Sequence, residues 1–167
     1  TANGWALMSM AELLEELPEN YEGRTKVLHQ LRPHISGLPG YQGHLNNQCV
    51  TIAEVLKTAG YFTAMSGKWH VGHEEGGRPQ ERGFDRSLNA AAGGFYFPET
   101  PRAELFLNGE LLAKNDPRLP KDWYSTDLWT TFGLTFIDEA LTEKKPFYLL
   151  LCHTAPHVPH QAPAEEI

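Results

Sequence analysis

The chain has 167 residues, of which 41% are hydrophobic and 21% charged, a balance typical of a folded globular domain rather than of a disordered segment. Fourteen Lys and Arg against 21 Asp and Glu give a net charge of -7, and the basic residues are scattered singly, which argues against a nucleic-acid-binding surface. No apolar run reaches the roughly 18 residues of a transmembrane segment, and two cysteines are too few for a disulfide framework.

The first part of the chain differs in pattern from the rest. Residues 9–17 start with a capping-box sequence and have apolar residues on one face, which predicts a short helix. Residues 37–40 predict a turn. We therefore expect a divergent N-terminal segment over residues 1–37 and a second unit over residues 38–167. Because the chain begins at Thr1 without an initiator Met, we expect a processed or excised segment.

The second unit opens with a helix whose two ends are both marked in the sequence. Thr51 and Glu54 have capping-box spacing, an apolar stripe follows them, and Gly60 stands where a left-handed helix cap is favoured. Residues 61–65 then predict a short strand, and Gly67 begins the loop after it.

Further along, residues 71–103 are rich in Gly, Pro and charge, and we expect them to be mostly loop. An Asn-Gly pair between two apolar runs predicts a hairpin over residues 104–112. A helix follows that Ser125 or Thr126 can cap. Residues 147–152 form an uninterrupted apolar run, typical of a parallel strand that is covered on both faces. The order of elements predicts an α/β fold.

Histidine-rich loops follow both predicted parallel strands. Gly67-Lys68-Trp69-His70 comes after the first strand, and a loop with three histidines comes after the second; these histidines are His153, His157 and His160. Ligands of open α/β sheets bind beyond the carboxyl ends of the strands, so we expect the two loops to converge on one site.

Three segments carry a resemblance to a known family. TIAEVLKTAGYFTAMSGKWHVG at 51–72, RPQERGFDRSLNAAAGGFYF at 78–97 and TAPHVPHQAP ending at 163 resemble, in this order, the type I sulfatases, the arylsulfatase branch of the alkaline-phosphatase superfamily. The resemblance covers residues 38–167 and implies an α/β fold of the alkaline-phosphatase and sulfatase type, a parallel-sheet sandwich that is incomplete in this chain. It also implies a sulfuric ester hydrolase.

The resemblance assigns roles to three residues. Lys68 and His70 match the family's sulfate-contacting pair, with His70 also beside the nucleophile, and His157 matches the histidine that protonates the leaving group or binds sulfate. An ammonium group in a dry pocket stabilises the charge that develops on sulfate oxygens. We therefore predict Lys68, His70 and His157 as catalytic residues, and Lys68 and His157 as substrate-binding residues. Trp69 is expected to pack under its loop.

Other parts of the family's machinery have no counterpart in the sequence. The formylglycine nucleophile arises from Cys or Ser in C/S-x-P/A-x-R, and neither Cys49 nor Cys152 lies in such a run. The resemblance implies Ca²⁺ in the full-length enzyme, but its paired Asp ligands and its Asp-Asn ligands have no match here, so we assign no metal ligand to this chain. The chain also ends soon after a core strand, which favours a fragment over a degenerate protein. We expect a partial catalytic domain that is inactive by itself.

The sequence leaves several alternatives open. One is a phosphate or phosphonate monoester hydrolase of the same superfamily, and another is a non-catalytic module that keeps the anion pocket. A third is a histidine-rich zinc binder, to which His73 would belong if it paired with His70. The resemblance implies a small-molecule or carbohydrate sulfate ester as substrate, and a family whose members are often periplasmic, secreted or lysosomal. Selectivity would lie in loops such as 73–103, where three arginines could approach an anionic group: Arg78, Arg82 and Arg86.

Overall fold

The computed structural model describes residues 45, 49–72, 74–101 and 103–166. The predicted helix over residues 9–17, the turn at 37–40 and the boundary after residue 37 lie outside this set. The helices are α3 (Ile52–Thr58) and α4 (Ser125–Thr142), with 3-10 turns η1 (Pro79–Arg82) and η2 (Ala164–Glu166). The strands are β1 (Phe62–Lys68), β2 (Arg86–Ala90), β3 (Phe106–Leu107), β4 (Glu110–Leu111) and β5 (Phe147–Cys152).

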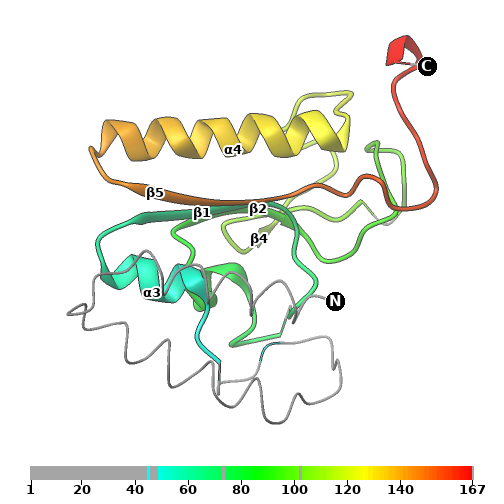
Figure 1. Cartoon of the computed structure of the whole chain (residues 1–167). Coiled ribbons are helices and arrows are strands. Elements are labelled where there is room, and N and C mark those ends of the chain that lie inside the picture. The colour runs from blue at the N-terminus through cyan, green and yellow to red at the C-terminus, as the bar shows by residue number, and fades with distance from the viewer. Residues whose placement is uncertain (1–44, 46–48, 73, 102, 167) are drawn as a thin grey trace.

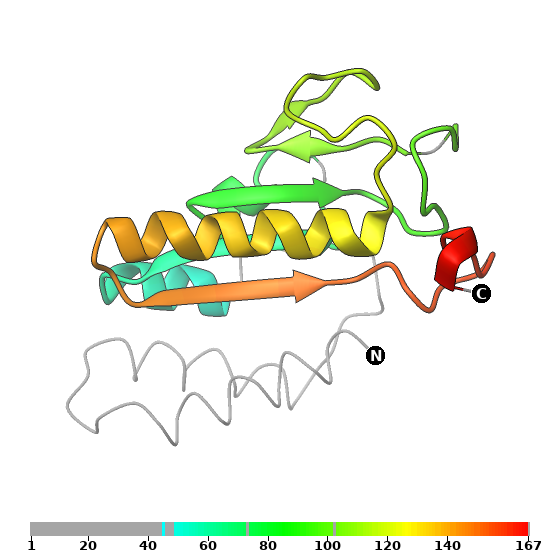
Figure 2. The same ribbon diagram turned by 90° about the horizontal axis from the view of Figure 1, so that it is seen from above.

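The strands form one sheet in the order β4-β3-β2-β1-β5. Strand β1 runs parallel to both β2 and β5, while the β3–β4 hairpin is antiparallel, so the sheet is mixed rather than purely parallel. Gly67 is the register partner of Asn89 on one side and of Cys152 on the other. The carboxyl ends of the three parallel strands therefore lie at one edge of the sheet, and their loops leave from that edge (Figure 2).

One helix covers each face of the sheet, which gives the predicted α/β architecture three layers (Figure 1). The larger core lies between the sheet and α4 and includes Leu88, Trp129 and Phe136, all almost fully buried. The second core lies on the α3 side and includes Met65 and Phe84. Consecutive side chains of a strand point to opposite faces, so β1 contributes side chains to both cores and is covered on both faces. None of the helices in the described part of the chain has the length and apolar character needed to cross a membrane.

Local chemistry explains why these elements form where the sequence predicts them. The Thr51 hydroxyl accepts a hydrogen bond from the Glu54 backbone N–H at 3.0 Å, and the Glu54 carboxylate accepts from the Thr51 N–H at 2.6 Å. The predicted capping box is thus confirmed, and Gly60 follows with a φ of +84°. Asn108 and Gly109 both have positive φ, as the predicted hairpin turn requires.

The structure adds to one prediction and corrects two. Residues 71–103 are mostly loop, as predicted, but they also contain η1 and the central strand β2. The N-cap of α4 is Tyr124, so neither Ser125 nor Thr126 caps it, and both hydroxyls are buried without a hydrogen bond. Strand β5 is parallel but only half-buried, because it lies at the end of the strand order in the described sheet.

Candidate functional site

The site begins where β1 reaches the edge of the sheet. Gly67 has a φ of +122°, and a Cβ atom there would overlap the carbonyl group of Cys152 on the adjacent strand. Only glycine tolerates both the backbone angle and this close approach. Lys68 follows at the last position of β1 and is half-buried. Among the described residues, its ammonium group has no hydrogen bond or ion pair, so it is available to an anion.

Lys68 and His157 meet at Gly93, in the loop after β2. A Cβ atom on Gly93 would lie 3.5 Å from Lys68 Nζ and 3.5 Å from His157 Cδ2. Lys68 Nζ and His157 Cδ2 are therefore no farther apart than about twice that distance, and both lie close to a residue without a side chain. Gly94 also lies against the imidazole, since a Cβ there would be 3.6 Å from His157 Nδ1. The predicted convergence of two strand-end loops is found, with a third loop between them.

The ring of His157 is oriented by its own loop. Its Nδ1 lies 2.5 Å from the carbonyl oxygen of Val158, and because a carbonyl oxygen only accepts hydrogen bonds, Nδ1 carries a proton in this geometry. The other ring nitrogen, Nε2, is left for a ligand. The His157 backbone N–H donates to the carbonyl of Thr154 at 3.0 Å, and the hydroxyl of Tyr96 donates to the His157 carbonyl at 2.6 Å.

The remaining histidines are not brought together into a metal site. His160 Nε2 lies 3.0 Å from the carbonyl oxygen of Pro156, and His153 and His70 are exposed. His73 lies outside the described residues. Across residues 45, 49–72, 74–101 and 103–166, no group of three or more His, Cys, Asp or Glu could hold a metal ion. These described residues thus lend no support to the zinc-binding alternative and do not fit a Ca²⁺ ion.

Trp69 packs as predicted and does not line the site. It is 6% exposed, its indole N–H donates to the carbonyl of Gly77 at 2.9 Å, and its ring meets Phe84 edge-on at 5.7 Å. Trp69 therefore holds the end of β1 and the loop after it against the core. Its neighbours Lys68 and His70 lie on the side away from that core.

Two of the arginines considered for substrate selectivity have structural roles instead. Arg82 is buried, and its Nε donates to Glu54 at 3.0 Å across the N-terminus of α3. Arg86 pairs with Glu139 of α4 at 2.7 Å. Burial acts against the charged guanidinium of Arg82, but its hydrogen bonds to Glu54 and Cys49 outweigh burial and raise its pKa. These two cations are committed to carboxylates rather than directed toward a ligand.

Cys152 lies against Gly67 at the end of β5 and could be mistaken for a nucleophile. Burial raises the pKa of its thiol. A thiol with a raised pKa is protonated at neutral pH and is a poor nucleophile. Cys152 therefore has a structural role, as the residue of β5 that packs against Gly67.

Sequence reasoning missed the contribution of the loop after β2. Gly93, Gly94 and Tyr96 complete the surroundings of Lys68 and His157, although their sequence pattern predicted no role for them. Burial, and then the neighbouring Tyr124, raise the pKa of Tyr96, so its hydroxyl stays protonated and able to donate. The adjacent glycines were the available signal, because glycine pairs often mark a close approach of backbone to a ligand.

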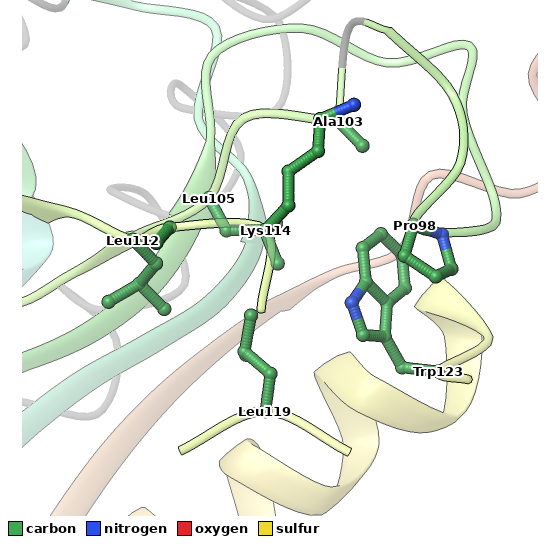
Figure 3. A pocket seen from close by; sticks show the side chains of 8 residues that line it. Pro98, Ala103, Leu105, Leu112, Lys114, Leu119 and Trp123 are labelled. Atoms are coloured by element: carbon green, nitrogen blue, oxygen red, sulfur yellow. The ribbon is translucent and has the colours of Figure 1, made fainter. Parts of the chain in front are cut away.

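A separate pocket lies between the β3–β4 hairpin and the start of α4 (Figure 3). Trp123, Leu119 and Leu112 are among its lining residues, and Lys114 passes along it. Its free volume is about 10 Å³. This is room for about one water molecule, so the pocket is a packing gap and not a substrate site.

Comparisons with known sequences agree with the predicted resemblance. A family model described as Sulfatase matches residues 9–166. The match includes most of segment 1–37, whose separate status stays a prediction. The chain is 37% identical over 142 residues to an uncharacterised sulfatase of Schizosaccharomyces pombe, with 78% of this chain and 25% of the relative covered. It is 34% identical over 135 residues to an arylsulfatase of Klebsiella aerogenes, with 78% and 29% covered.

Solved structures show the same α/β fold. The structure of Ps i-CgsB in complex with k-i-k-neocarrahexaose superposes with a TM-score of 0.66 at 29% identity, over 76% of this chain and 31% of that chain. The structure of BT4656 in complex with its substrate D-glucosamine-2-N,6-O-disulfate superposes with a TM-score of 0.55 at 25% identity, over 75% and 22%. The chain thus spans between about a fifth and a third of the length of these relatives.

Proposed function

The chain belongs to the sulfatase family, and on this premise we propose that it supplies the sulfate-binding side of the active site of a sulfuric ester hydrolase. The observation that carries the proposal is the convergence of Lys68 Nζ and the His157 ring at Gly93. A half-buried ammonium group without a partner among the described residues, next to an imidazole with one free nitrogen, suits a small tetrahedral anion.

Lys68 has the electrostatic part in this proposal. Cleavage of a sulfate ester places negative charge on the sulfate oxygens and on the leaving oxygen. An ammonium group carried by the last residue of β1 stabilises that charge as it develops. By analogy with the loss of one oxyanion-hole donor, removal of this group would raise the barrier by about 3 kcal/mol.

His157 has the proton-transfer part. Its Nδ1–H is held by the Val158 carbonyl, so the second proton of the imidazolium form is on Nε2. That proton can be donated to the leaving oxygen or to a sulfate oxygen. His70, exposed directly after Trp69, is proposed to lie beside the nucleophile and to assist release of sulfate. These three assignments rest on the family resemblance together with the geometry at Gly93.

The nucleophile and the metal site lie, in this proposal, outside the 167 residues. The described residues do not fit a Ca²⁺ ion, and we derive no step through one. The chain by itself is then expected to bind sulfate without turnover. Hydrolysis of an aryl sulfate by the purified 167-residue chain with added Ca²⁺ would overturn this part of the proposal.

A sulfated carbohydrate is the proposed class of substrate. Its support is the named substrate of BT4656, a disulfated glucosamine, and the 29% identity over 125 residues to a mouse N-acetylgalactosamine-6-sulfatase. The loop that includes the exposed residue Arg78 is proposed to contribute to selectivity.

The test measures protection by inorganic sulfate against thermal unfolding. Sulfate also stabilises proteins without binding a site, so each variant is compared in sulfate and in chloride at equal ionic strength. We expect the rise in melting temperature in sulfate over chloride to be larger for the wild type and for Lys145→Ala than for Lys68→Ala, whose rise reflects only the non-specific effect of sulfate. Lys145 is a suitable control because it is exposed beside the amino end of β5, where it pairs with Glu143. An equal rise in all three proteins would contradict the proposed pocket.

The same assay separates sulfate from phosphate as the preferred anion. Ligand stabilisation follows RT ln(1 + [L]/Kd), so titration of each anion gives its dissociation constant. We expect tighter binding of sulfate. Tighter binding of phosphate, lost in Lys68→Ala, would instead favour a phosphate or phosphonate monoester hydrolase.

A further inference from the structure

We propose that Tyr96 and Thr154 are positioning residues, which hold the backbone on both sides of His157 so that its imidazole faces Lys68 across Gly93. The inference deepens the proposed function and rests on it, because it concerns the same anion pocket. The Tyr96 hydroxyl contacts the His157 carbonyl and the Thr154 hydroxyl contacts Trp129, so neither hydroxyl is directed to Lys68 or to the imidazole. Both residues affect anion binding by fixing the position of His157.

The loop that carries His157 provides little support of its own. Residues 155–161 are all exposed, and only a small number of buried groups hold this loop to the body of the protein. A side chain on such a loop has many orientations unless the flanking peptide groups are fixed. A proton donor must stand within hydrogen-bond distance of its acceptor, so the site needs this loop to be fixed.

Tyr96 fixes the peptide group on the carboxyl side of His157. It is 1% exposed, and its hydroxyl donates to the His157 carbonyl at 2.6 Å. Tyr96 is itself immobile, since its ring stacks on Tyr124 with centroids 6.0 Å apart and its carbonyl accepts from Ser125 N–H at 2.8 Å. Contacts with the start of α4 thus hold Tyr96, in the loop after β2, in position for its hydrogen bond to His157.

Thr154 fixes the peptide group on the amino side. Its carbonyl accepts the His157 N–H at 3.0 Å, and its hydroxyl accepts from the indole N–H of Trp129 at 3.2 Å. Thr154 is 4% exposed and Trp129 is fully buried in the core under α4. With both flanking peptide groups held, the Cα–Cβ bond of His157 points toward Gly93, and the Val158 carbonyl sets the rotation of the ring.

The experiment compares Tyr96→Phe with the matched control Tyr124→Phe in the 167-residue chain. Both changes remove one phenolic hydroxyl and keep the stacked rings. The Tyr124 hydroxyl donates at 3.2 Å to Gln161, beyond His157 in the same loop. Two readouts are used: the NMR cross-relaxation between the His157 ring proton on Cδ2 and the Gly93 Hα protons, and the dissociation constant of inorganic sulfate.

We expect Tyr96→Phe to weaken the cross-relaxation signal and to raise the sulfate dissociation constant about three- to tenfold, the range of one net hydrogen bond. Tyr124→Phe should leave both near the wild-type values. If Tyr96→Phe does not fold, Thr154→Val, which removes the acceptor of the Trp129 N–H, is expected to weaken the same signal. Wild-type values of both readouts in the folded variants would overturn the inference.

The two readouts keep this inference separate from the proposed function. If wild-type protein shows the cross-relaxation signal, Tyr96→Phe weakens it, and no protein binds sulfate, then the positioning role is supported and the proposed anion pocket is refuted. If sulfate binds to the wild type and Lys68→Ala abolishes binding, while Tyr96→Phe and Thr154→Val change neither readout, then the pocket stands and the positioning role is refuted.

Discussion

Gly67 and Cys152 are register partners at the carboxyl ends of β1 and β5, and their backbones are so close that a methyl group on Gly67 would overlap the Cys152 carbonyl. The strand that ends in Lys68 and the strand that leads to the His157 loop are thereby held side by side. The site therefore depends on a residue that has no side chain.

Gly67→Ala is the corresponding test of stability. The new side chain meets both an unfavourable φ of +122° and the Cys152 backbone, so we expect a loss of at least about 2 kcal/mol in the free energy of unfolding. Gly60→Ala is the matched control, because Gly60 also has positive φ but has nothing within 4 Å of the added Cβ. Its expected loss is about 1 kcal/mol, from backbone strain. Urea denaturation of both variants gives the comparison, and equal losses would show that the Cys152 contact is unimportant.

Elements with strong local chemistry could be predicted from the sequence. The α3 capping box, the Asn108-Gly109 turn and β5 follow from interactions between residues that are close in the chain, so their patterns are visible without the fold. The histidine-rich loops could be placed at strand ends for the same reason. Their convergence needed one further assumption, that the strands are parallel.

Strand β2 could not be predicted, because several hydrogen-bond partners of its polar residues lie outside the strand and are known only from the fold. Ser87 N–H donates to the side chain of Asn108 at 2.9 Å, and the Ser87 hydroxyl bonds to Gln80 and Asn89. A buried strand with Ser and Asn looks like a loop until these partners are known. Tyr96 was missed for a similar reason, since its acceptor is 61 positions away in the chain.

The Arg82–Glu54 ion pair is expected to stabilise the fold rather than the site. Arg82→Met leaves the half-buried Glu54 carboxylate and the Cys49 carbonyl without this donor, and we expect a loss of about 3 kcal/mol in the free energy of unfolding. Arg118→Met is the control, because Arg118 also bonds to two acidic residues but at an exposed position. Exposed pairs contribute little, so the control should lose much less stability than Arg82→Met. Chemical denaturation measures both, and a small loss for Arg82→Met would indicate that water replaces the guanidinium.

Asp85 gives the protein a predictable sensitivity to acid. Partial burial acts to raise the pKa of Asp85, but hydrogen bonds from Lys57 and Thr63 outweigh it and hold the pKa below its ordinary value of 3.8. A carboxyl group with a depressed pKa stabilises the folded state above its unfolded-state pKa, and this contribution is lost as pH falls through the folded-state pKa. We expect the stability advantage of wild type over Asp85→Asn to be full at about pH 5 and to decline below about pH 4.

Urea denaturation between pH 5 and pH 2 measures this advantage, and the ¹³C shift of the Asp85 carboxyl group gives its pKa directly. Lys57→Met removes the 2.7 Å ion pair and should move that pKa upward. A stability difference that stays constant across the range would contradict the expected role of Asp85.

Gly93→Ala tests the site without disturbing the fold. Gly93 is not among the residues with positive φ, and the added Cβ would lie at ordinary contact distance from its neighbours, so the melting temperature should change little. The same Cβ would lie 3.5 Å from both Lys68 Nζ and His157 Cδ2, in the space proposed for a sulfate oxygen. We expect sulfate affinity to fall at least about fivefold, as overpacking costs on the order of 1 kcal/mol or more. Gly60→Ala, at the other end of β1, should keep wild-type affinity. Calorimetric titration of sulfate into both variants measures these affinities. If Gly93→Ala binds sulfate as tightly as the wild type, the anion is not held by Lys68 and His157 together.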